Sequence, residues 1–303
     1  APSRCCPSLA TMITGLYPHQ NKSTGNEPPI PPQGKQAAEY QRLVQKCVSF
    51  IDTVPTLPRL LAKRGYVSHQ SGKWWQGHYS RGGFTQGMTH GDPKRRGRHG
   101  DEGLKIGSEG LQPIYDFIDN AGDKPFFIWY APFLPHTPHN PPKRLLDKYT
   151  EKTESKFIAR YWAMCEWFDE TCGQLLDHLD EKNLAKDTIV LYVTDNGWIQ
   201  RTDNGRYAPR SKRSPYDGGL RQAFGIGWPG KVQPGGRPEL ANSVDLAPTL
   251  LKACGLEWTG AMQGIDLLDE SAVAKRKSTH GACYLHNAID IHKPSANLTH
   301  RWL

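Results

Sequence analysis

The 303-residue sequence has no apolar run close to the roughly 20 residues that a membrane-spanning helix needs. It also has no internal repeat and no recognisable nucleic-acid-binding module, so we expect neither a membrane span nor a nucleic-acid partner. Its seven cysteines are not spaced as zinc ligands, and their odd number leaves at least one unpaired. The net charge of +8 suits an anionic substrate.

The remaining composition is that of a globular domain, with 37% hydrophobic and 22% charged residues. Apolar runs alternate with helical patterns along the chain. Strands are predicted near 66–71, 126–130, 188–193, 223–228 and 298–303, and helices near 53–64, 111–120, 156–179 and 244–253. The strands at 126–130 and 188–193 are strongly apolar and are predicted to be buried. This alternation predicts an α/β sandwich of helices around a mostly parallel, mixed sheet.

The most informative segment runs from Cys5 to Gly15. Its apolar residues recur at helical spacing, Pro7 suits a first helical turn, and Gly15 suits a helix end. Cys5 is therefore expected beside the unpaired N–H groups and the positive dipole end of a helix, where anions bind. A structural thiol or half of a disulfide is the alternative interpretation of Cys5.

Polar residues follow three of the predicted strands. These are Lys73, His136 and the pair Asp195-Asn196. Carboxylate and amide oxygens are ligands that suit Ca²⁺ or Mg²⁺, although Asp-Asn-Gly is also common in turns. Because ligands of such folds bind beyond the carboxyl ends of the strands, we expect these side chains to lie near one another.

Five segments, taken in order, resemble the type I sulfatases of the alkaline phosphatase superfamily. They are Cys5-Cys6-Pro7-Ser8 with its following Thr-Gly, Gly72-Lys73-Trp74, Pro135-His136-Thr137-Pro138, Thr194-Asp195-Asn196-Gly197, and the run from Lys212 to Arg221. Each segment alone is of modest specificity, but their common order makes a chance match improbable.

The resemblance implies an arylsulfatase-like sulfuric ester hydrolase. In that family the Cys, here Cys5, is converted to formylglycine, whose hydrated aldehyde attacks the sulfur of a sulfate monoester. The resemblance also implies catalytic contacts from Lys73, His136 and Lys212. The implied partners are a sulfated small molecule or sulfated glycan and a formylglycine-generating enzyme. An exported protein (periplasmic, extracellular or lysosomal) is implied as well.

The resemblance further implies a divalent metal, Ca²⁺ in preference to Mg²⁺, on Cys5, Asp195 and Asn196. The family carries an additional Asp-Asp metal pair and a first strand upstream, and this sequence lacks that stretch. We therefore expect residues 1–270 to form a catalytic domain without its first strand, and residues 271–303 to begin a C-terminal subdomain. The chain is expected to be a fragment truncated at both ends.

Two positions depart from the family pattern. Leu9 stands where the family carries an Arg that helps maturation, and Trp75 stands where a His acts as a base. Trp cannot accept a proton, so His78 is a nearby candidate for that role, and a histidine in a surface loop is the alternative interpretation of His78. The basic run 94–99 is predicted to be a solvated loop or a contact for neighbouring sulfates. A phosphate or phosphonate ester hydrolase of the same superfamily, or a degenerate binder of sulfated glycans, stays an alternative.

Overall fold

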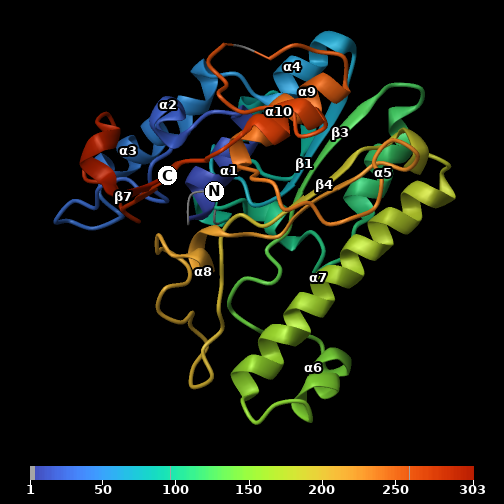
Figure 1. Ribbon diagram of the computed structural model, residues 1–303. Helices are drawn as coiled ribbons and strands as arrows, with labels where there is room; N and C mark the ends of the chain where they lie inside the picture. The colour runs from blue at the N-terminus through green and yellow to red at the C-terminus, as the bar shows by residue number, and fades with distance from the viewer. Residues whose placement is uncertain (1–3, 96, 259) are drawn as a thin grey trace.

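The computed structural model describes residues 4–95, 97–258 and 260–303 (Figure 1). Three strands form one parallel sheet in the order β2-β1-β3: β1 (Val67–Gly72), β2 (Gln86–Gly87) and β3 (Phe126–Ala131). Helices pack on both faces of this sheet, which confirms the predicted α/β class. Alternate side chains of β3 face two separate cores, as the period of two in a strand requires.

Two antiparallel pairs of strands complete the strand content of the described residues. They are β4 (Val190–Val193) with β5 (Phe224–Gly227), and β6 (Gly281–Tyr284) with β7 (Leu298–Trp302). The strand predicted for 298–303 is therefore confirmed. The fold thus contains both parallel and antiparallel strands, but the antiparallel strands form two separate two-stranded sheets rather than extending the parallel one.

Two groups of helices cover the parallel sheet. One core is built from α1 (Cys5–Thr14), α4 (Leu57–Leu61) and α9 (Leu246–Ala253), and the other from α5 (Gln112–Ala121) and α7 (Lys156–Glu181). The remaining α-helices are α2 (Pro18–Asn21), α3 (Ala38–Ser49), α6 (Lys143–Thr150), α8 (Asp217–Leu220) and α10 (Glu270–Lys275). Short 3₁₀ helices lie at Phe50–Thr53, Ala62–Arg64, Tyr79–Gly82, Pro93–Arg95, Asp101–Lys105, Ala185–Asp187, Ser243–Asp245 and Pro294–Asn297.

The helix predicted after Cys5 is confirmed, but it is buried on every side rather than on one apolar face. All ten residues of α1 are buried. The helix ends at Gly15, which adopts a left-handed φ of 66° and donates its N–H to Thr11. A β-carbon on Gly15 would lie 3.0 Å from the Cβ of Ala247 in α9. Tight packing on α9 therefore fixes the position of α1 and of Cys5 at its start.

Three local predictions differ from the structure. The strands at 126–130 and 188–193, predicted to be buried, are half-buried, and Tyr192 is 41% exposed. Each is an edge strand within the described residues, so one side lacks a strand neighbour. The helix predicted to begin at 53 begins at Leu57, because Thr56 is extended before it.

None of the described helices is both long and apolar enough to cross a membrane, including α7 with its 26 residues.

Candidate active site

Cys5 is the first residue of α1 and is 3% exposed. Its Sγ donates a hydrogen bond to Asn196 Oδ1 at 3.5 Å, and Lys212 Nζ lies 3.7 Å from the same sulfur. Burial raises the pKa of the Cys5 thiol, and the charge of Asp195 adds to this effect. The thiol is therefore protonated near neutral pH, which agrees with its role as a donor. Residues from three distant parts of the chain thus meet at the helix start.

Asp195 and Asn196 follow β4 directly, as predicted. The carboxylate oxygen Oδ2 of Asp195 is buried and has no hydrogen-bond partner. Its nearest cation is Lys73, whose Nζ lies 4.0 Å away. Burial alone would raise the pKa of Asp195, but the charges of Lys73 and Lys212 outweigh burial and hold the pKa below its usual value. A buried, ionised oxygen without a donor is a suitable ligand for a hard cation.

The chemistry of this group fits part of a divalent metal site. The free carboxylate oxygen of Asp195, the amide oxygen of Asn196 and residue 5 lie together. No three His, Cys, Asp or Glu residues are grouped as metal ligands anywhere in the described ranges 4–95, 97–258 and 260–303, and this site is no exception. A cation held here would therefore need further oxygen ligands beyond these side chains.

Lys73 is positioned by a close approach of two parallel strands. Gly72, at the end of β1, has a φ of 82°, and a β-carbon there would lie 1.8 Å from the carbonyl oxygen of Ala131. The next residue, Lys73, donates its backbone N–H to that carbonyl at 2.6 Å. Burial alone would lower the pKa of Lys73, but Cys5 in its ionised form and the carboxylate of Asp195 raise it above its usual value. The ammonium group is thus charged in a nearly closed site.

His136 lies in the loop after β3, within the same electrostatic environment. Its Nδ1 is 2.7 Å from the carbonyl oxygen of Thr137, and since a carbonyl can only accept, Nδ1 donates. Burial, together with the charges of Lys73 and Lys212, lowers the pKa of His136 to about 3. In the free protein the imidazole is therefore neutral, and its Nε2 is an acceptor.

Lys212 approaches Cys5 from the loop that precedes α8. Its Nζ lies 5.5 Å from the centroid of the Trp198 ring, which is within the range of a cation–π contact. The same ring lies 6.5 Å from that of His136. Sequence reasoning missed Trp198, although its place directly after the strand-end segment 194–197 was a usable signal.

The positions that depart from the family pattern are apolar in the structure as well. Leu9 and Trp75 are buried with Cys5 in one hydrophobic cluster. The Trp75 ring also packs against His99, at 4.4 Å between ring centroids, and against the guanidinium of Arg98 at 5.4 Å. His78 bonds to Ser80 at 2.8 Å and packs on Tyr79. The structure does not bring His78 to Cys5, and the prediction of a base at His78 gains no support.

The basic run 94–99 is not a uniformly solvated loop. Lys94 and Arg95 are exposed, whereas Arg98 donates to the carbonyl oxygens of Trp75 and Asn26, both at 2.7 Å. Position 96 lies outside the described residues. Arg98 is thus a structural residue, which ties this loop to the segment after β1.

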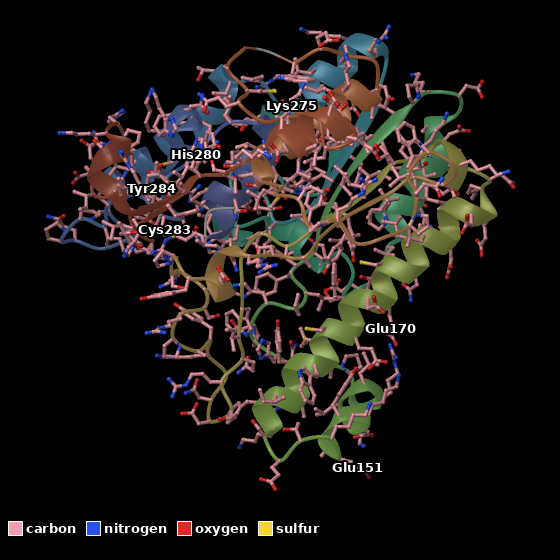
Figure 2. All side chains as sticks on the ribbon, viewed as in Figure 1. Glu151, Glu170, Lys275, His280, Cys283 and Tyr284 are labelled. Carbon is pink, nitrogen blue, oxygen red and sulfur yellow. The ribbon has the colours of Figure 1, made fainter. Side chains whose placement is uncertain are left out.

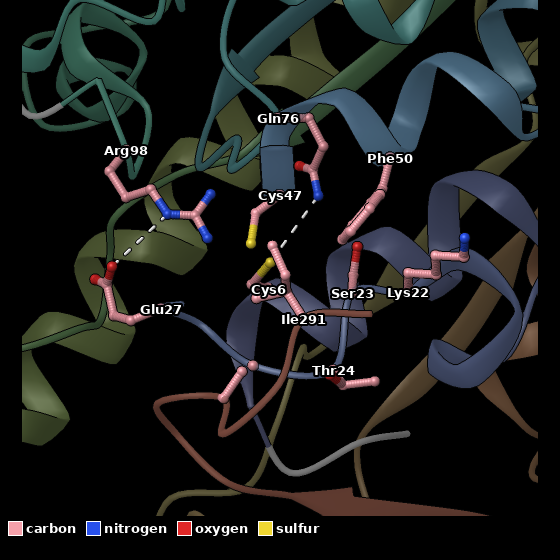
Figure 3. Close-up of a pocket in the computed structure, with 12 residues that line it drawn as sticks. Cys6, Lys22, Ser23, Thr24, Glu27, Cys47, Phe50, Gln76, Arg98 and Ile291 are labelled. Carbon is pink, nitrogen blue, oxygen red and sulfur yellow. Dashed lines mark hydrogen bonds and ion pairs between the residues drawn. The ribbon is translucent and has the colours of Figure 1, made fainter. Parts of the chain in front are cut away.

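A small pocket lies behind Cys6 and is separate from the charged group around Cys5 (Figure 3). Its volume is about 10 Å³, room for roughly one water molecule. Glu27 and Arg98 line one side of it, with an ion-pair distance of 3.7 Å, and Cys47 lies next to Cys6. Its size excludes a substrate.

Comparison with known proteins agrees with this geometry. The sulfatase family model matches residues 1–256. N-acetylgalactosamine-6-sulfatase of Homo sapiens is 29% identical over 307 residues, which cover 87% of this chain and 56% of that protein. The chain spans about half the length of the curated relatives it matches.

Solved structures share the fold. Ps i-CgsB in complex with k-i-k-neocarrahexaose superposes with a TM-score of 0.72 at 21% identity, over 93% of this chain and 69% of that one. BT4656 in complex with its substrate D-glucosamine-2-N,6-O-disulfate has a TM-score of 0.72 at 18% identity, over 95% and 75% of the two chains. The family match over most of the sequence, and the residues gathered at Cys5, lead to one conclusion: this chain belongs to the sulfatase family.

Proposed function

We propose that the protein hydrolyses a sulfate monoester, with a formylglycine derived from Cys5 as nucleophile and a divalent cation, Ca²⁺ in preference to Mg²⁺. One observation carries this proposal. Lys212 Nζ and Asn196 Oδ1 lie 3.7 and 3.5 Å from Cys5 Sγ, next to the unpartnered carboxylate oxygen of Asp195. Since a sulfate ester is an anion, a nucleophile reaches its sulfur only where cations neutralise the oxygens.

The cationic groups have distinct positions around residue 5. Lys73 lies on the Asp195 side and Lys212 contacts the sulfur directly, so the two ammonium groups would bind different sulfate oxygens. The start of α1 adds backbone N–H groups and the positive end of the helix dipole. Formylglycine would supply a hydroxyl nucleophile. The cation would be held by Asp195, Asn196 and residue 5, and it would supply a Lewis acid.

Proton transfer to the departing oxygen is assigned to Lys212. An ammonium group offers three donors, whereas neutral His136 presents an acceptor at Nε2. A bound sulfate would place negative charge beside His136 and raise its pKa, which would let the imidazole hold the ester oxygen through a hydrogen bond. Lys212 is therefore assigned as the proton donor and His136 as the group that binds the ester oxygen, because the two side chains differ in charge.

The proposed substrate is a sulfated saccharide or a related sulfated small molecule. The curated relative acts on an N-acetylgalactosamine 6-sulfate by its name, and one structural neighbour is bound to a disulfated glucosamine. We also propose that a formylglycine-generating enzyme matures Cys5 and that the protein acts after export, in line with the family resemblance.

Mass spectrometry of the peptide that contains Cys5, isolated from the full-length protein, tests the nucleophile. An aldehyde in place of the thiol is the expected result, and an intact thiol together with glycan binding would support the non-catalytic alternative.

Rates on 4-nitrophenyl sulfate and 4-nitrophenyl phosphate then test the reaction. We expect the sulfate to be preferred, and a preference for phosphate would overturn the sulfatase assignment. Removal of divalent ions with a chelator should abolish turnover, and added Ca²⁺ should restore it.

A further inference from the structure

A second group of basic side chains lies next to Cys5 and has no part in the mechanism above. Arg4 immediately precedes Cys5 and is 8% exposed, which is unusual for an arginine. Its Nε donates to the carbonyl oxygen of Tyr284, but its Nη1 is buried and has no hydrogen-bond partner. A buried guanidinium nitrogen without an acceptor is costly, and it requires an explanation.

Arg213 and His286 lie beside Arg4. Arg213 Nη2 is 3.1 Å from His286 Nδ1, and because a guanidinium only donates, Nδ1 accepts and the ring proton is on Nε2. Burial and the charges of Arg213 and Arg4 lower the pKa of His286 to about 4, so the ring is neutral at pH 7. The imidazole therefore keeps one N–H donor for another partner. We call Arg4, Arg213 and His286 the Arg4 cluster.

The positive charge of the Arg4 cluster is not compensated within the described residues. None of the ion pairs in that part of the chain includes Arg4 or Arg213. Glu27 is the carboxylate that acts on His286, and it is already bonded to Tyr40 at 2.6 Å.

The Arg4 cluster adjoins the proposed sulfate site through the chain itself. Arg4 is next to Cys5, and Arg213 is next to Lys212, which contacts Cys5. Arg4 bonds to Tyr284 and Arg213 bonds to His286, so both arginines contact the short segment that starts at the end of β6. Figure 2 labels Tyr284 in this segment. Arg213 is exposed, His286 is half-buried and Arg4 is buried, so the cluster is reached from solvent at its Arg213 end.

We propose that Arg4, Arg213 and His286 bind a second sulfate group of the same saccharide whose ester is cleaved at residue 5. This inference rests on the proposed function and narrows the substrate to a multiply sulfated saccharide. The donors come from three separate segments, which matches the three terminal oxygens of a sulfate better than the two of a carboxylate. Charge-assisted hydrogen bonds from guanidinium groups give such a site its affinity.

Equilibrium binding to the full-length protein tests this site separately from catalysis. The probes are glucosamine 2-N,6-O-disulfate and N-acetylgalactosamine 4,6-disulfate, each compared by calorimetry with the 6-monosulfate of the N-acetylated sugar. A Cys5→Ala background prevents turnover during the titration. We expect at least one disulfated sugar to bind about tenfold or more tightly than its monosulfated counterpart.

Arg213→Gln should reduce that preference about tenfold, because it removes an exposed donor that the fold does not require. Arg206→Gln on the same loop is the matched control, since Arg206 is exposed and outside the cluster, and it should leave the preference intact. Equal binding of disulfated and monosulfated sugars, or an equal loss for both with Arg213→Gln, would overturn the proposal. If wild-type protein fails to cleave 4-nitrophenyl sulfate but keeps the Arg213-dependent preference, the proposed hydrolysis fails and the binding site stands.

Discussion

Cys5 and Cys6 are neighbours on one helix and each is 3% exposed, yet their surroundings are opposite in kind. Cys6 faces a network in which most polar groups are paired. Its backbone N–H donates to Asn26 at 3.2 Å, and Arg98 bonds to the carbonyl oxygens of Asn26 and Trp75. Glu27, in the same network, accepts from Tyr40 at 2.6 Å.

Around Cys5, in contrast, the buried charged groups are not fully hydrogen-bonded. Lys73 and Lys212 lie near one carboxylate, and that carboxylate of Asp195 has an oxygen with no donor. Such an arrangement does not stabilise the fold, because a buried carboxylate oxygen without a hydrogen-bond donor destabilises the native state. The difference between the two sides of α1 therefore separates residues that stabilise the fold from residues held ready for a ligand.

Replacement of Asp195 tests this distinction most strongly. Asp195→Ala should lower kcat of the full-length protein by about a thousandfold or more, because it removes a cation ligand and leaves Lys73 uncompensated. Because Lys73 loses its counter-ion, the thermal unfolding midpoint should also fall, and circular dichroism checks that the variant is folded at the assay temperature. Steady-state rates on an aryl sulfate, together with a metal analysis, provide the measurement.

Asp203→Ala is the matched control. Asp203 is exposed and pairs with Arg201 on the surface, so its loss should change kcat less than about twofold. If a folded Asp195→Ala variant retained wild-type activity, the role of Asp195 as a functional ligand would be refuted.

On the Cys6 side the main effect is expected on stability rather than on activity. Glu27→Gln should destabilise the protein by about 2–4 kcal/mol, because it leaves Arg98 without its carboxylate in a buried network. Hydrogen bonds and cations overcome burial and lower the pKa of Glu27 to about 2. The stabilisation by this carboxylate is therefore complete above pH 4.5 and lost as pH falls from 4.5 towards 2.

Urea denaturation of wild-type protein and Glu27→Gln, at pH 7 and at pH 3, measures this effect. The difference between the two proteins should shrink at the lower pH. A variant that was as stable as wild type at pH 7 but inactive would place Glu27 in the catalytic group instead, and the comparison between the two sides of α1 would fail.

Much of this arrangement could be predicted from the sequence. Strand ends are marked by short polar segments after apolar runs, so Lys73, His136, Asp195 and Asn196 could be placed at one edge of the sheet before any coordinates. Their gathering around Cys5 follows from that rule, as the structure shows for Asp195, Asn196 and Lys73.

The paired network could not be predicted in the same way. Glu27, Tyr40 and Arg98 come from irregular or weakly periodic segments, and their contacts depend on tertiary packing rather than on spacing. The same limit applies to the Arg4 cluster, because no local pattern indicates that Arg4 is buried or that His286 accepts from Arg213. Loops carry these residues, and hydrophobic periodicity gives no information about loop conformation.

His69 is buried and has no hydrogen-bond partner, yet it belongs neither to the paired network at Cys6 nor to the charged group at Cys5. It lies in β1, is 4% exposed, and both of its ring nitrogens lack hydrogen-bond partners. Burial lowers the pKa of His69 to about 4, so the native ring is neutral where the unfolded ring, with a pKa of 6.5, is protonated. The unfolded state then binds more protons between pH 6.5 and 4, and stability falls as pH falls through that window.

The loss should reach about 3 kcal/mol by pH 4, and it should be absent above pH 6.5. Denaturation of wild-type protein and His69→Leu across this range measures it: the difference in unfolding free energy should change with pH by that amount, in favour of the variant in acid. A pH-independent difference would mean that His69 is protonated in the native state and has a partner. An absent partner therefore supports the proposed cation site at Asp195, where the charge persists. It does not indicate a site at His69, because that group avoids the cost of burial by losing its charge.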